Sequence, residues 1–95
     1  MPAKLTEAQL TTAVESLPNW KVDQGELTRS ITFPDFKAAI AFVNQVAAFA
    51  EAANHHPDID IRYNKVRLAL ITHDSGGITQ KDVDLATSID AVLTK

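Results

Sequence analysis

The chain of 95 residues contains no cysteine, and it has only three glycines and four prolines. Without cysteine it can form no disulfide framework, thiolate nucleophile or sulfur-ligated metal site. The longest weakly polar stretch, residues 38–53, is rich in alanine and is interrupted by Asn44, Gln45 and Glu51. It therefore predicts a packed helix rather than a membrane span. Because the N-terminus also carries no apolar signal segment, we expect a cytoplasmic protein with no membrane partner.

An excess of basic residues is also lacking. Nine Lys and Arg residues stand against twelve Asp and Glu residues, for a formal charge of −3, and no stretch clusters basic with aromatic side chains. Direct nucleic-acid binding is therefore disfavoured. The apolar content of 45% is enough for one core in a chain of this length, which predicts a single domain over residues 1–95.

Seven secondary-structure elements are predicted from the spacing of apolar residues. Three segments repeat apolar residues at helical spacing, and four alternate them as strands do. Thr6 with Gln9 forms a capping box at the first helix, and Pro34 with Asp35 opens the central one. The expected elements are a helix over 7–17, strands over 20–22 and 26–33, a helix over 35–53, strands over 58–63 and 66–73, and a helix from 79 to 93.

The four strands form two predicted hairpins, with turns at residues 23–25 and 64–65. Each antiparallel hairpin would leave one apolar face bare. A single four-stranded antiparallel sheet with the three helices on one face resolves this problem. The predicted fold is thus an α+β two-layer sandwich in the order αββαββα. In this arrangement His73 ends the last strand, on the same side of the pleat as Arg67.

All three histidines lie where one pocket could collect them. His55 and His56 follow the long helix directly, Pro57 ends it, and His73 comes 17 residues after His56. Imidazole both donates and accepts a proton near neutral pH, so a pocket with several imidazoles predicts proton-transfer chemistry. Glu51 precedes His55 by four residues, and we expect its carboxylate to orient that ring. The alternative is a surface pair that contributes only tenths of a kcal/mol.

Simpler interpretations apply to each of these residues. His55 and His56 would also cap the carbonyl end of a helix, and His73 would also face solvent from a strand. Thr79 with Asp82 is sufficient as a capping box without any further role.

A metal site is a further alternative. Catalytic zinc and non-haem iron accept two or three histidines with a carboxylate, a set that Glu51, His55, His56 and His73 would provide. Spacing alone permits this interpretation.

Several motifs are spaced along the whole chain. They are Trp20 after Leu17-Pro18-Asn19, Phe33-Pro34-Asp35-Phe36, Glu51-x3-His55-His56-Pro57, Tyr63-Asn64-Lys65-Val66, Thr72-His73, and Ile78-Thr79 with Asp82. Together they cover about residues 5–93 and resemble the pterin-4a-carbinolamine dehydratase family. Agreement of several spaced motifs is far more specific than a lone pair of histidines.

This resemblance implies an enzyme that dehydrates 4a-hydroxytetrahydrobiopterin to quinonoid dihydropterin and water, in the recycling of tetrahydrobiopterin. It implies acid–base catalysis with no metal and no other cofactor. The implied catalytic residues are His55 and His73, which transfer protons, and His56, which mainly holds the pterin. The implied substrate-binding residues are Glu51, Asn54, Pro57, Thr72, Asp82 and Trp20.

Two positions depart from the resembling family. Asn54 stands where some members have aspartate, so a charged partner for the amidine edge of the pterin is lost there. Ile78 stands where leucine is common, which is a conservative change.

Self-association is also expected. The alanine-rich helix permits close approach of a second helix, and an edge strand can extend a sheet across a two-fold axis, which predicts a homodimer or homotetramer. Some members of the resembling family also serve as cofactors of homeodomain transcription factors. A non-enzymatic scaffold is therefore the alternative function.

Overall fold

The computed structural model describes residues 3–93 of the chain. Its elements follow the predicted order αββαββα, and the predicted α+β class is confirmed. They are α1 (Glu7–Glu15), β1 (Lys21–Asp23), β2 (Glu26–Thr32), α2 (Phe36–Ala53), β3 (Asp58–Arg62), β4 (Lys65–Leu70), the 3₁₀ turn η1 (His73–Ser75) and α3 (Gln80–Leu93).

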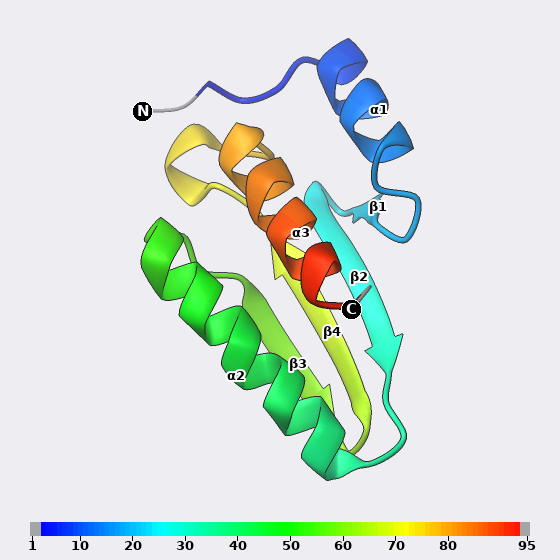
Figure 1. Cartoon of the computed structure of the whole chain (residues 1–95). Helices are drawn as coiled ribbons and strands as arrows, with labels where there is room; N and C mark the ends of the chain where they lie inside the picture. Colours follow the sequence, from blue (N-terminus) through cyan, green and yellow to red (C-terminus); the bar gives the residue numbers. More distant parts are fainter. Residues whose placement is uncertain (1–2, 94–95) are drawn as a thin grey trace.

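The four strands form one antiparallel sheet in the order β1-β2-β4-β3. Figure 1 shows α2 and α3 crossing the same face of this sheet, with α1 beside β1. The core lies between these layers, where Leu27, Leu68 and Leu70 are fully buried. Within residues 3–93, no helix is both long and apolar enough to cross a membrane.

Both predicted helix starts are present. The Thr6 hydroxyl accepts the Gln9 N–H at 3.1 Å, and the Gln9 side chain accepts the Thr6 N–H at 2.9 Å, which completes the capping box. The Asp35 carboxylate accepts the Ala38 N–H at 2.8 Å. α2 then buries one stripe at helical spacing, formed by Ala39, Phe42, Val46 and Ala50.

The turn of the second hairpin lies one residue earlier than predicted. It is at Tyr63 and Asn64, not at 64–65, because Arg62 pairs with Lys65 in the sheet. Tyr63 adopts a left-handed backbone with φ 55°. The Asn64 side chain fixes the turn by donating to the Phe33 carbonyl at 2.8 Å.

The end of β4 also differs from the prediction. β4 stops at Leu70, so His73 lies on no strand and the predicted pleat side does not apply to it. The chain instead folds back through a bridge between Thr72 and Gly77. Gly76, with φ 73°, supplies the left-handed residue that this tight return requires.

Candidate active site

A cleft of about 410 Å³ opens where the end of α2, the chain after β4 and the start of α3 meet. It contains all three histidines, as the sequence predicted. The cleft is lined by Asn54, His55, His56, Ile71, Thr72, His73, Asp74 and Lys81.

The way α2 ends positions the first two histidines. Asn54 adopts a left-handed backbone, with φ 52° and ψ 42°. The His55 N–H then donates to the Ala50 carbonyl at 3.1 Å, and the Asn54 N–H donates to the Glu51 carbonyl at 3.2 Å. This is the Schellman pattern of helix termination, and asparagine tolerates its left-handed residue better than most side chains. His55 and His56 consequently leave the helix in different directions.

His55 is held by a buried carboxylate. Its Nε2 lies 2.5 Å from Oδ1 of Asp82, which is fully buried, and the His55 side chain itself is 12% exposed. The other Asp82 oxygen accepts the Thr72 hydroxyl and the Thr79 N–H, each at 2.9 Å. Because the carboxylate accepts all three bonds, we assign the Nε2–H tautomer to His55. Its Nδ1 is then the remaining acceptor of the ring.

Asp82 also takes part in the predicted capping box. Its bond to the Thr79 N–H is one half of the capping box of α3, and the Thr79 hydroxyl accepts the Lys81 N–H at 3.2 Å. The Thr79 and Thr72 hydroxyls lie 2.8 Å apart. Since Thr72 donates to Asp82, Thr79 donates to Thr72, and the start of α3 and the wall of the cleft form one hydrogen-bonded unit.

Glu51 contacts a different histidine from the predicted one. Its Oε2 lies 2.5 Å from Nε2 of His56, and both side chains are exposed, at 77% and 56%. The prediction that Glu51 orients His55 is therefore wrong. The left-handed residue at Asn54 diverts His55 from the surface of α2, so the carboxylate reaches the ring five residues away. At this exposure the pair contributes about 0–1 kcal/mol to stability.

His73 is exposed and lies in the 3₁₀ turn η1. It lines the same cleft as the two histidines at the end of α2. The turn is closed by the Thr72 N–H, which donates to the Gly77 carbonyl at 3.0 Å, and by the Gly76 N–H, which donates to the His73 carbonyl at 3.0 Å. A short hydrogen-bonded loop, rather than a strand, thus presents this imidazole.

Four predicted binding residues lie outside the cleft lining, and two of them, Glu51 and Asp82, reach it through the histidines that they contact. Pro57 is half-buried and leads the chain into β3. Trp20 is 3% exposed, and its Nε1 donates to Oδ1 of Asp90 at 2.8 Å, an oxygen that also accepts from Arg29. Asp90 is eight residues beyond Asp82 in α3, which is about 12 Å along the helix. Trp20 thus belongs to the core.

Sequence reasoning missed Ile71, Asp74 and Lys81 in the cleft lining. The available signal was adjacency, because Asp74 follows His73 and Lys81 precedes Asp82 in the chain. Periodicity could not reveal them, since the cleft is built from a loop and the first turn of a helix.

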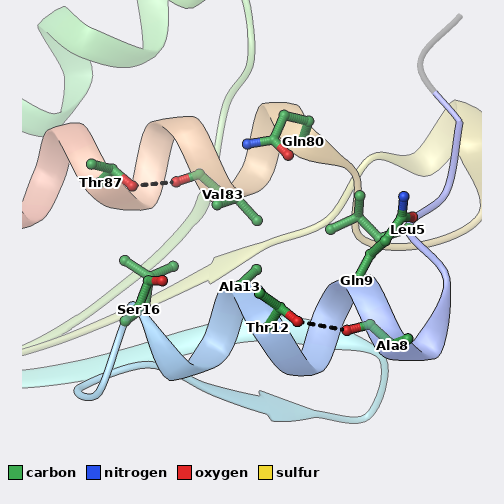
Figure 2. A pocket seen from close by; sticks show the side chains of 10 residues that line it. Leu5, Ala8, Gln9, Thr12, Ala13, Ser16, Gln80, Val83 and Thr87 are labelled. Atoms are coloured by element: carbon green, nitrogen blue, oxygen red, sulfur yellow. Dashed lines mark hydrogen bonds between the residues drawn. The ribbon is translucent and has the colours of Figure 1, made fainter.

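A larger groove of about 480 Å³ lies between α1 and α3 and contains none of the predicted site residues (Figure 2). No titratable side chain lines it. Its threonine hydroxyls donate within their own helices, from Thr12 to the Ala8 carbonyl at 3.1 Å and from Thr87 to the Val83 carbonyl at 2.9 Å. This groove therefore offers no group for acid–base chemistry.

The metal alternative requires a cluster of ligands. Across residues 3–93, no three His, Cys, Asp or Glu side chains are arranged to hold a metal ion. The Nε2 atoms of His55 and His56 contact separate carboxylates instead.

Comparison with known proteins identifies the family. The model of the family described as pterin 4 alpha carbinolamine dehydratase matches residues 3–92. The chain belongs to this family. A relative from Acidobacterium capsulatum, named for this dehydratase, is 58% identical over 91 residues, covering 96% of this chain and 99% of the relative. One from Chloroflexus aurantiacus with the same name is 52% identical over 90 residues, covering 95% of this chain and 97% of the relative.

Solved structures of the family share the fold. The transcriptional coactivator/pterin dehydratase from Brucella melitensis superposes with a TM-score of 0.90 at 35% identity, covering 94% of this chain and 97% of that one. A pterin dehydratase-like protein described as a RuBisCO assembly factor has a TM-score of 0.63 at 22% identity, covering 77% of this chain and 84% of that one, and shows the shared fold alone.

Proposed function

We propose that this protein dehydrates 4a-hydroxytetrahydrobiopterin to quinonoid dihydropterin and water by histidine acid–base catalysis. The observation that carries the proposal is the cleft in which all three imidazoles meet, one of them bonded to the buried Asp82. Membership in the family supports a pterin as the substrate.

The reaction needs two proton transfers. The bond between C4a and its hydroxyl oxygen breaks, N5 loses its proton, and a double bond forms between C4a and N5. One group must protonate the departing hydroxyl and another must accept the N5 proton. A well-placed side chain contributes about 10²–10⁴-fold to each kind of transfer. The N5 lone pair supplies the push that expels water.

The two catalytic histidines have different surroundings, which suggests how the roles divide. His55 accepts the N5 proton at Nδ1, because Asp82 is bonded to the opposite ring nitrogen and stabilises the imidazolium that forms. His73 is exposed to solvent and protonates the leaving hydroxyl. It then takes up a proton from water. His56, paired with Glu51 at the rim, holds the pterin together with Asn54 and Thr72.

A stopped-flow assay of 4a-hydroxytetrahydropterin dehydration tests this proposal. We expect the wild-type protein to accelerate the reaction over buffer, and the His55→Ala, His73→Ala double variant to lose at least about 10²-fold of that acceleration. Thr87→Ala, in the groove between α1 and α3, is the matched control and should retain the wild-type rate. A wild-type protein that gives no acceleration over buffer would overturn the proposal.

A further inference from the structure

A second hollow adjoins the cleft. It is a groove of about 340 Å³ between the end of α2 and the first turns of α3. Lys81 lines both the cleft and the groove, and Ala53 of the groove directly precedes Asn54 of the cleft. The two hollows are therefore neighbours, and Lys81 lies between them.

The groove differs from the cleft in chemistry. The cleft is walled by imidazoles and other polar groups, whereas the groove is mainly apolar, with Phe49, Ala52 and Ala53 from α2 facing Leu85 from α3. The Phe49 side chain is 37% exposed, so part of its ring is open to contact. A hollow of this size and composition suits a ring-sized apolar group.

Two charged side chains line the groove, and only one of them has a side-chain partner in the part of the chain that the structure describes. Asp84 accepts a hydrogen bond from the Gln80 side chain at 2.8 Å. Lys81 is exposed, and none of the ion pairs within residues 3–93 includes its ammonium group. Lys81, which has no ion-pair partner among residues 3–93, thus lines both hollows, and the groove also contains a partly exposed aromatic ring.

The pterin ring of the proposed function places its C6 substituent toward this groove. In a tetrahydropterin, C6 is bonded to N5, the atom that must lie among the histidines, so the C6 substituent leaves the ring next to the reacting atoms. We propose that the groove is a subsite for an aryl substituent at C6 of the pterin. This inference rests on the proposed function: the same pterin ring reacts, and an aryl group at C6 adds binding that the hydroxylated side chain of tetrahydrobiopterin does not supply.

The physical basis is a match between an aryl ring and the two groups that flank it. The ring packs against Phe49 as an aromatic pair, and the Lys81 ammonium interacts with its π face. A short hydroxylated substituent gains less, because it has less apolar surface to bury against these walls. The polar groups of the groove include the Ser88 hydroxyl and the carboxylate of Asp84, which already accepts a hydrogen bond from Gln80. The groove therefore favours an arylated pterin over one that carries only a small or hydroxylated side chain.

Binding of two unreactive, oxidised pterins measures this preference. The dissociation constants of 6-methylpterin and 6-phenylpterin are determined from quenching of pterin fluorescence. We expect the wild-type protein to bind 6-phenylpterin about tenfold more tightly. Ala52→Leu fills the groove and should abolish this difference, while its affinity for 6-methylpterin stays within about twofold. Ala41→Leu, on the same face of α2 but three turns away, is the matched control and should keep the tenfold preference.

Two results would overturn the subsite while leaving the proposed function intact: equal affinities of the wild-type protein for the two ligands, or equal weakening of both by Ala52→Leu. If Ala52→Leu alone changes the mass in solution and the wild type shows no aryl preference, the groove is a contact between subunits and the proposal is wrong. Failure of both pterins to bind, together with no acceleration of dehydration, refutes the proposed function and the subsite with it.

Discussion

Asp82 is the residue on which the geometry of the cleft depends most. It is fully buried, and its two oxygens accept from the His55 ring, the Thr72 hydroxyl and the Thr79 backbone. Removing this acceptor would leave its buried donors without a hydrogen-bond partner. Each such donor lowers the free energy of unfolding by about 1–3 kcal/mol. The same carboxylate thus supports both the stability of the α3 start and the orientation of one imidazole.

Replacing this carboxylate tests its double role. For Asp82→Asn we expect a loss of about 1–3 kcal/mol in the free energy of unfolding, and a dehydration rate lowered by at least about tenfold, because the amide cannot stabilise an imidazolium. Urea denaturation and stopped-flow kinetics measure the two effects. Glu15→Gln, at an exposed position of α1, is the control and should change neither. A fully active Asp82→Asn protein would refute the assigned role.

The backbone conformation of Asn54 affects stability separately from any contact of its side chain with the pterin. Its left-handed backbone, with φ 52°, is easy for glycine and unfavourable for alanine. We expect Asn54→Gly to change the free energy of unfolding by a few tenths of a kcal/mol, and Asn54→Ala to lower it by about 1 kcal/mol. The urea midpoints of the two variants decide this. Equal stability of both would mean that the left-handed turn is not retained in solution.

At the scale of elements, the end of α2 separates two adjacent histidines into different environments. His55 meets the buried Asp82, whereas His56 meets the exposed Glu51. The sequence predicted the helix and its end, because Pro57 excludes helical dihedrals just before it. It did not predict the partners, since the left-handed residue at Asn54 changes which side chain faces α2.

Because Glu51 contacts His56 and not His55, we expect its replacement to have only a small effect on activity and stability. We expect Glu51→Gln to lower the dehydration rate by less than about tenfold and the free energy of unfolding by at most about 1 kcal/mol, because the pair with His56 is exposed. The same stopped-flow and urea measurements apply. A loss as large as that of His55→Ala would show that Glu51 acts on His55 in the working enzyme.

The loop after β4 shows where sequence reasoning reaches its limit. Apolar residues alternate from Val66 to Leu70 in the sequence, and this pattern predicted a strand as far as His73. The chain instead turns at Thr72, which pairs with Gly77 while its hydroxyl bonds to Asp82. Such a turn depends on contacts with α3, which local periodicity does not contain.

For the whole molecule, the sequence predicted the layers of the fold but not which strands form the edges of the sheet. Alternation and helix signals predicted four strands and three helices, and the observed strand order places β1 and β3 at the two edges. All five residues of β3 are exposed, and they include Ile59 and Ile61. An edge strand with open apolar side chains favours pairing with another chain.

Self-association is accordingly predicted to run through β3. We expect a solution mass of two or four chains, reduced by the Ile59→Lys, Ile61→Lys double variant, because buried lysines oppose pairing of the edge. Val22→Lys places a single lysine on the opposite edge strand, β1, and should leave the mass unchanged. Sedimentation equilibrium measures all three. A wild-type protein that sediments as a single chain would contradict this prediction.

The central claim is that His55 and Asp82 work as one unit in moving a proton of the pterin. The most direct measurement is the single-turnover dehydration rate of four proteins: wild type, His55→Ala, Asp82→Asn and the variant with both changes. Residues that act as a unit are not additive, so the double variant should be no slower than His55→Ala, and both should be at least about 10²-fold slower than wild type. Losses that multiply in the double variant, or a wild type no faster than buffer, would contradict the account.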